Sequence, residues 1–270
     1  GYHLNIDLAD RAIRFLKDAN NIAPDKPFFL YYATGAGHAP HHVEPEWIER
    51  YRGRFDDGWE AYRETVLARQ KEMGVVPDEA ELSRHDPDVP AWDSLSEDQR
   101  RLFARQMETY AGFLTQTDHH FGRILDYLEE VGELDNTLVI VLSDNGASAE
   151  GGLSGTHNEM LLVNNLQTEL EENLKRYDAW GSEQTNNHFH AGWAMAGNTP
   201  FKYFKQVVHR GGVQDPLIIH WPAGIEAKGE IRSQYHHIID IAPTIMESLG
   251  LEPPNEIDGI AQIPIDGVSM

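Results

Sequence analysis

The sequence predicts an α/β fold with a mostly parallel sheet flanked by helices. Short, uncharged runs at 28–32, 137–141 and 216–221 are typical of strands buried on both faces. Helical patterns separate these runs, so right-handed crossovers would join the strands. Small and polar residues follow the first two runs, and that end of a strand is where open α/β sheets hold ligands.

The elements of the first third follow from apolar spacing and end signals. Residues 4–19 carry apolar side chains at helical spacing, and Pro24 and Pro27 end that helix. A helical pattern with polar breaks covers 47–73. Residues 77–95 are acidic and contain proline, which indicates a surface excursion.

The longest helix is expected from Ser96 to about Val131. Ser96 is a suitable N-cap, and Glu97 and Asp98 place negative charge in the first turn. Gly132 ends the helix, and the strand at 137–141 follows directly.

The second half contains a long segment with little regular structure. Residues 147–198 are rich in glycine and asparagine around one short helix at 158–176, and a loop excursion of this length is usually functional. Trp180, Phe189 and Trp193 could form an aromatic wall for an aryl substrate or simply pack this loop onto the domain. A last helix is expected at 236–249, with Gly250 as its C-cap.

Composition excludes several classes of function. The 270 residues carry a formal net charge of −22, so binding to nucleic acid or to an anionic membrane is not expected. No run is apolar enough to span a membrane and no signal peptide is evident, so we expect a soluble protein. The compartment (bacterial cytoplasm or periplasm) and the oligomeric state stay open. Cysteine is absent, which excludes disulfides and thiolate metal sites in this chain.

Two hard oxygen donors, Asp144 and Asn145, follow the strand at 137–141. A turn would explain Asp-Asn-Gly equally well if the motif stood alone. His38, with other histidines, lies after the first strand, and Lys205 lies ahead of the third. A single loop histidine or lysine is usually structural or a surface charge, so the argument rests on all three loops occurring in one order.

In that order the loops resemble the sulfatase family. The matching features are Ser143-Asp144-Asn145-Gly146, then the run from Asn198 through Lys205 and Gly211-Gly212 to Trp221-Pro222, with His38-Ala39-Pro40 and Asp240-Ile241-Ala242-Pro243-Thr244 as further matches. The chain is similar to the arylsulfatase branch of the alkaline phosphatase superfamily. The resemblance implies an alkaline-phosphatase-like fold, incomplete at its N-terminus, with residues 1–270 forming part of the catalytic domain.

The resemblance also implies residue roles. Asp144 and Asn145 match the pair that binds one divalent cation, usually Ca²⁺, which suits their oxygen ligands. Lys205 matches a lysine that bridges the sulfate and the nucleophile, and His38 matches a histidine near the sulfate and the leaving oxygen. Lys202 is a weaker candidate for the lysine because of its spacing to Gly211.

The family's formylglycine nucleophile, made from Cys or Ser in a Cys/Ser-x-Pro-x-Arg motif, has no counterpart in this chain. The early Asp-Asp pair of the metal site is missing too, and in the family both precede the region present here. We therefore expect a truncated reading frame that is inactive by itself. His209-Arg210 stands where many relatives have an aromatic residue and Glu.

The expected function is hydrolysis of small-molecule sulfate monoesters by an arylsulfatase-type enzyme. A phosphomonoester or phosphonate-ester hydrolase of the same superfamily is the first alternative, and a non-catalytic relative that binds sulfated glycans is the second. A two-zinc phosphatase is disfavoured, because His188 and His190 have no evident carboxylate partners in the sequence. The substrate itself cannot be named from the sequence.

Overall fold

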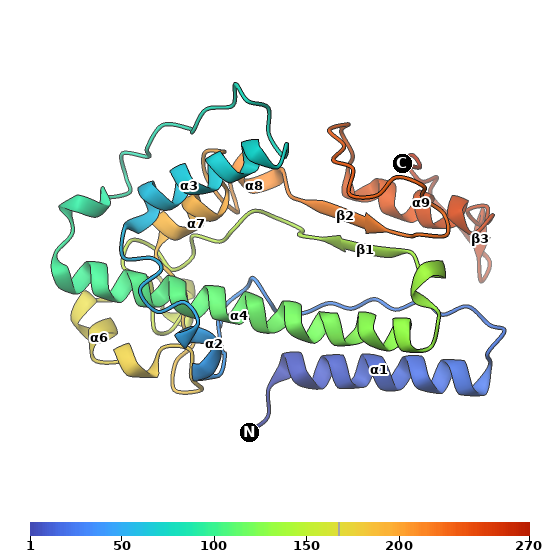
Figure 1. Ribbon diagram of the computed structural model, residues 1–270, viewed down its shortest axis with the longest axis horizontal. Coiled ribbons are helices and arrows are strands. Elements are labelled where there is room, and N and C mark those ends of the chain that lie inside the picture. The colour runs from blue at the N-terminus through green and yellow to red at the C-terminus, as the bar shows by residue number, and fades with distance from the viewer. Residues whose placement is uncertain (167) are drawn as a thin grey trace. The chain divides into compact units, whose positions relative to one another are not determined.

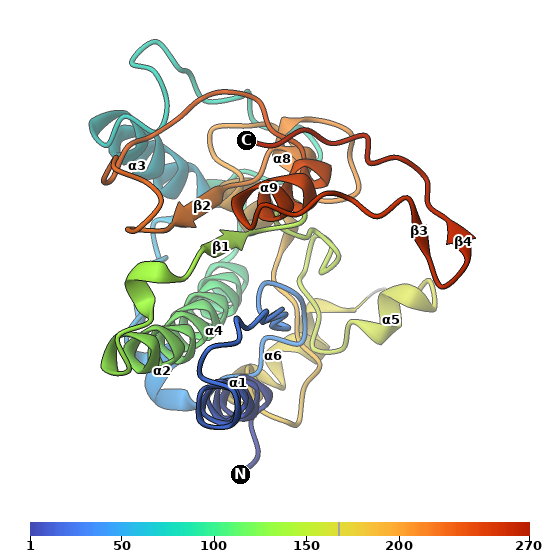
Figure 2. The ribbon, with the colours of Figure 1, turned by 90° about the vertical axis from the view of Figure 1, so that its right-hand side faces the viewer.

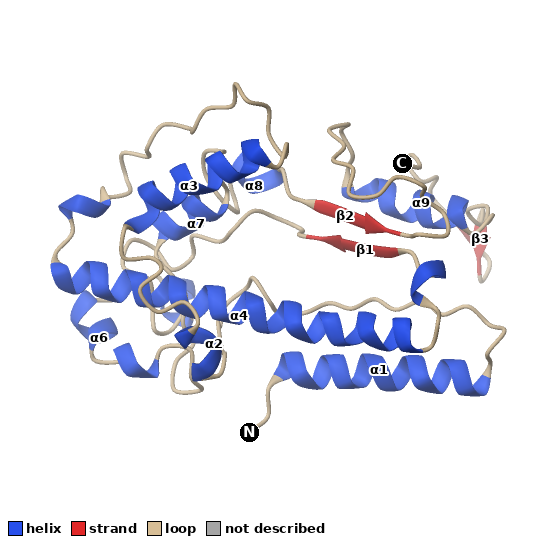
Figure 3. Ribbon diagram, viewed as in Figure 1, coloured by secondary structure: helices blue, strands red, loops and turns tan. Residues whose placement is uncertain are grey.

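The computed structural model describes residues 1–166 and 168–270, which divide into two compact units at residue 226. Helices and loops make up most of the chain, as Figure 3 shows. In the described residues, no helix combines the length and the apolar character that crossing a membrane requires.

Two long helices form the frame of the first unit. α1 (Leu4–Ile22) and α4 (Glu97–Glu130) lie side by side and run in the same direction (Figures 1 and 2). The Nδ2 atom of Asn5 donates to Oε1 of Gln116 at 2.9 Å near the start of α1, and apolar side chains are buried further along. Both helices were predicted close to their observed ends.

The start of α4 is set by a capping box. The Ser96 hydroxyl accepts from the backbone N–H of Gln99, and the Gln99 side chain accepts from the backbone N–H of Ser96. A short helix, α2 (Pro45–Glu49), packs on α4 where Gly112 allows a close approach of the Trp47 backbone.

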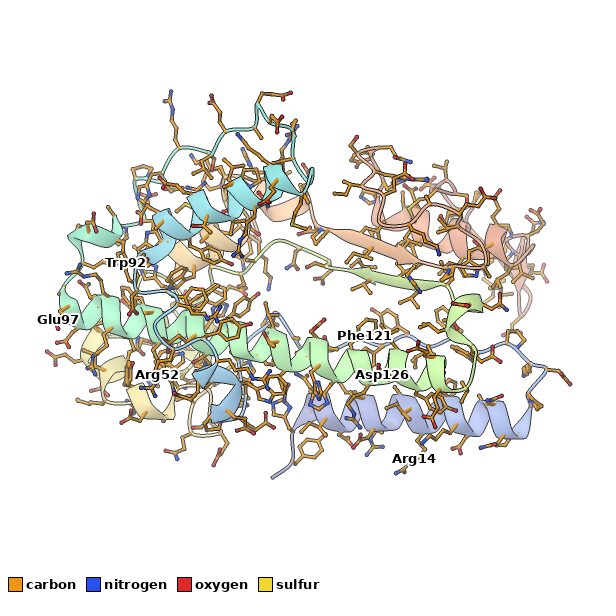
Figure 4. All side chains as sticks on the ribbon, viewed as in Figure 1. Arg14, Arg52, Trp92, Glu97, Phe121 and Asp126 are labelled. Carbon is orange, nitrogen blue, oxygen red and sulfur yellow. The ribbon has the colours of Figure 1, made fainter. Side chains whose placement is uncertain are left out.

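An aromatic core joins α3 (Gly58–Glu72) and α7 (Ala191–Gly197) to the first half of α4. The Trp59 ring stacks on the His190 ring at 4.6 Å between centroids, and Trp193 packs edge-on against Trp59. Figure 4 shows Trp92 beside this region, near the start of α4. Trp180, Phe189 and Trp193 of the predicted 147–198 segment belong to this core.

Within residues 1–166 and 168–270 the strands pair antiparallel and do not form the predicted parallel sheet. β1 (Val139–Leu142) and β2 (Leu217–His220) pair antiparallel, with Leu142 opposite Leu217. The prediction assumed a crossover helix between them, whereas the chain returns through a long irregular segment, and antiparallel neighbours need no crossover helix. Residues 28–32 are extended but are not a strand in any ladder that the described residues form, so the prediction of a buried strand there is wrong.

Short elements replace the helix predicted at 158–176. α5 (Met160–Val163) and α6 (Leu170–Leu174) are separate, and α8 (Arg210–Val213) precedes β2. Single 3₁₀ turns occur at Trp92–Ser94, Leu134–Asn136 and Tyr177–Ala179.

The second unit, residues 227–270, is small. A 3₁₀ turn at Ile238–Asp240 leads into α9 (Ile241–Ser248), and β3 (Glu256–Ile257) pairs with β4 (Ile260–Ala261). Gly250 has φ +66° and its N–H donates to Glu247, which is the predicted glycine end of the helix.

Candidate active site

The Asp144-Asn145-Gly146 turn begins two residues after β1 ends. The Ser143 hydroxyl donates to the Asn145 carbonyl at 2.9 Å, and the Asn145 amide donates to the Gly146 carbonyl at 3.0 Å. These local bonds orient the turn. The Asp144 side chain is exposed and Asn145 is half-buried.

The turn and the loop before β2 are in direct contact. The Gly146 N–H donates to the Gly212 carbonyl at 3.2 Å. A Cβ on Gly146 would overlap the carbonyl oxygen of Gly211, so only glycine fits at this approach. Gly146 of the Asp144-Asn145-Gly146 motif and the Gly211-Gly212 motif therefore contact each other directly.

Lys205 is attached to the same turn through its backbone. Its N–H donates to the Ala147 carbonyl at 3.0 Å, and the Asn198 side chain accepts from the Ala147 N–H at 2.9 Å. The Lys205 ammonium then lies 2.9 Å from Oε2 of Glu150. Lys202 instead lies over the ring of Tyr203, 4.3 Å from its centroid.

His38 approaches Glu150 from the first loop. Its Nε2 lies 3.9 Å from Oε2 of Glu150. Its Nδ1 lies 2.8 Å from the Ala39 carbonyl, which can only accept, so Nδ1 carries a hydrogen and Nε2 faces the carboxylate. His41, in contrast, is fully buried among aromatic rings, and His42 bonds to the Thr185 carbonyl.

Glu150 lies between the side chains of Lys205 and His38. Burial raises the pKa of its carboxyl group, but hydrogen bonds from Ser148 and Lys205 outweigh burial, so the net pKa is lowered and the group is ionised near neutral pH. With His38 and Glu159, Glu150 also forms a cluster whose ligand atoms lie within 4.8 Å of one another. The ammonium of Lys205 already supplies a cation to this cluster.

A second carboxylate, Asp215, lies close enough to Asp144 for their charges to interact. Burial and the negative charge of Asp144 raise the pKa of Asp215 to about 6. Two carboxylates and the Asn145 amide oxygen are hard donors, and the mutual repulsion of the carboxylates would be relieved by a divalent cation. The residues present therefore fit the predicted cation.

The contacts group the predicted residues into two pairs. Lys205 and His38 meet at Glu150, next to a cavity of about 150 Å³ lined by Glu150, Lys205, Gln206, Ala149, Leu162 and Phe204. Asp144 and Asn145 lie on the adjacent turn. The backbone bond between Lys205 and Ala147 connects the pairs.

Sequence reasoning missed Glu150 and its supporting residues. The only signal was the position of Glu150 inside the segment predicted to be functional, six residues after Asp144. The proposed aromatic wall is not accessible, since Trp180, Phe189 and Trp193 are each about 1% exposed and pack the loop onto the domain.

Comparisons with known proteins agree with the resemblance. Residues 1–251 match the Sulfatase family. An uncharacterized sulfatase of Schizosaccharomyces pombe is 31% identical over 87% of this chain and 42% of its own length. The arylsulfatase of Klebsiella aerogenes is 28% identical over 91% of this chain and 51% of its own length.

The solved structure of the putative sulfatase yidJ from Bacteroides fragilis shares the fold with a TM-score of 0.50. It is 18% identical, and the match covers 91% of this chain and 37% of that one. The chain belongs to the sulfatase family, within the alkaline phosphatase-like superfamily. It spans about half the length of the curated relatives it matches.

Proposed function

We propose that these residues are part of an arylsulfatase-type enzyme that hydrolyses small-molecule sulfate monoesters. The observation that carries the proposal is the meeting of Lys205 and His38 at one point beside the Asp144-Asn145 turn. A tetrahedral anion placed there would receive N–H donors from the Lys205 ammonium. The relatives named sulfatase and arylsulfatase support the same reaction class.

Lys205 and His38 would have different tasks. The ammonium has three N–H donors and its bond to Glu150 uses one, so two remain for sulfate oxygens. His38, with Nε2 directed into the site, is placed to hold or transfer a proton at the leaving oxygen. Charge that develops on the ester oxygens is stabilised by donors already in position, and this is usually a large part of catalysis.

The sulfatase family generally binds a divalent metal, and we assign Ca²⁺ to Asp144 and Asn145. A bound cation would supply Lewis-acid polarisation of a sulfate oxygen. Asp144 and Asn145 would hold that cation by oxygen atoms, with Asp215 close enough to interact with its charge. The formylglycine nucleophile would come from a part of the protein outside residues 1–270.

The test is a comparison of ester substrates with the whole enzyme that contains this chain. We expect kcat/KM for an aryl sulfate to exceed that for the matching aryl phosphate and phosphonate by at least tenfold. A preference for the phosphate or phosphonate would contradict the proposal. Binding of sulfated glycans without turnover of any ester would do the same.

A further inference from the structure

We propose that Glu150 is the positioning residue for Lys205, held in turn by Ser148 and His188. The inference rests on the proposed function, because it gives the Lys205 ammonium the task of binding the sulfate group. It adds a carboxylate that does not contact substrate and acts through the lysine.

Both oxygens of the Glu150 carboxylate are occupied. Oε2 accepts from the Ser148 hydroxyl at 2.7 Å and from the Lys205 ammonium at 2.9 Å. Oε1 accepts from the Gln206 amide at 2.7 Å. A carboxylate held at both oxygens has little freedom to rotate, so its position determines where the ammonium lies.

The hydrogen-bond directions extend this arrangement into the core. The Ser148 hydroxyl has one hydrogen, which goes to Glu150, because an ionised carboxylate can only accept. Ser148 Oγ therefore accepts from its other partners, the Glu150 N–H at 3.2 Å and Nε2 of His188 at 3.0 Å. His188 must carry its hydrogen on Nε2.

His188 is suited to this task because it is fully buried. Burial lowers the pKa of its imidazole to about 4, so the ring is neutral near pH 7 with one donor nitrogen. Ser148 is buried as well. A chain of hydrogen bonds thus leads from the buried interior to the cavity. It connects, in order, His188, Ser148, Glu150 and the flexible side chain of Lys205.

Lysine needs such a support more than most residues. Its four-carbon stem has many rotamers, and an ammonium displaced by 1 Å from a reacting group can cost on the order of 100-fold in rate. A carboxylate so close to a sulfate site would otherwise repel the substrate. The presence of this carboxylate is explained if it orients the lysine.

The central variant is Glu150→Gln, which keeps the shape and removes the charge. We expect kcat to fall by about 10- to 100-fold with KM changed by less than threefold, since the lysine is misplaced in the transition state. Ser148→Ala should shift kcat in the same direction by a smaller factor. The matched control is Glu172→Gln, which removes an exposed carboxylate paired with Lys175 and should leave both constants within twofold.

A double-variant cycle in the whole enzyme tests whether Glu150 acts through Lys205. With Lys205→Ala already present, Glu150→Gln should lower kcat by less than a further twofold. An undiminished effect in that background would overturn the proposal. So would a rise in kcat/KM with tighter inhibition by inorganic sulfate, because Glu150 would then be a competitor for the anion site.

A second readout does not depend on activity. In crystal structures of the wild-type enzyme and Glu150→Gln, we expect the Lys205 ammonium to shift by more than about 1 Å while the backbone stays in place. An unmoved Lys205 would overturn the positioning role whether or not sulfate esters are substrates. If Lys205 shifts but the enzyme does not hydrolyse sulfate esters, the proposed function fails and the positioning role stands.

Discussion

At the scale of single residues, the backbone around Lys205 is held in an unusual conformation. Tyr203 and Gln206 have φ of +67° and +75°, in the left-handed region that non-glycine residues rarely adopt. Each such residue costs on the order of 1 kcal/mol and persists only where its surroundings hold it. Here the Gln206 side chain bonds to Glu150. Strain in this loop is consistent with a requirement for one particular lysine position.

The buried histidines predict a pH dependence of stability. Burial lowers the pKa of His188 to about 4 and that of His190 to about 3, against an unfolded value near 6.5. Stability from these rings is present above pH 6.5 and is lost as the pH falls toward the folded pKa values, because only the unfolded chain takes up the protons. Each ring contributes a slope of up to about 1.4 kcal/mol per pH unit in that window.

The measurement is the free energy of unfolding of wild type and His188→Gln between pH 7.5 and 5. The difference between the two proteins should narrow as the pH falls, since the variant lacks one titrating ring. Asp215 works in the opposite sense, because its raised pKa means that stability is lost as the pH rises through about 6. Asp215 is present in both proteins, so its contribution cancels from the difference in unfolding free energy between them. A difference that is constant with pH would contradict the assignment.

At the scale of elements, the site is built by the contact between the turn after β1 and the loop before β2. Gly146 makes that contact possible, so Gly146→Ala should separate the loops and destabilise the protein by about 1–3 kcal/mol, as overpacking does. Gly122→Ala is the control, because a Cβ there meets nothing within 4 Å and alanine favours the helix α4. The test measures the thermal unfolding midpoint and kcat of both variants, and only Gly146→Ala should lower them. Equal effects would show that the close approach is unimportant.

The ranges of α1, α4 and β1 were predicted well, because periodicity or an end signal such as the Ser96 N-cap marks them. The predicted burial of β1 and β2 on both faces is wrong, since their residues are half-buried or exposed. The strand prediction at 28–32 is wrong because a short apolar run does not indicate whether a partner strand lies beside it. The single helix predicted at 158–176 is wrong, because α5 and α6 are separate short helices within that range.

The residues of the candidate site differ in how far the sequence marks them. Asp144, Asn145, His38 and Lys205 belong to motifs with a fixed order, so the resemblance names them, and their roles stay a prediction. Glu150 carries no local motif, and its place in the site arises only from folding, which brings it to Lys205 and His38 from other loops.

At the scale of the whole molecule, exposed apolar side chains lie on the strands. Ile218 on β2 is exposed, and so are Phe29 and Tyr31 of the extended segment. The curated relatives are about twice as long as the matched region. We therefore expect purified residues 1–270 to bind a hydrophobic dye more strongly than the whole enzyme and to show no sulfate-ester turnover above a Lys205→Ala control. Turnover comparable to that of the whole enzyme would refute this.

The central claim is that Asp144 holds the cation while Lys205 stabilises the sulfate group. The most direct measurement pairs steady-state kinetics with calcium titration of Asp144→Ala and Lys205→Ala in the whole enzyme. Asp144→Ala should lose both calcium binding and activity. Lys205→Ala should keep its calcium affinity while kcat falls by roughly 10²–10³, the usual cost of removing one donor to a developing oxyanion. An unchanged kcat in Lys205→Ala, or an equal loss of calcium by both variants, would contradict the account.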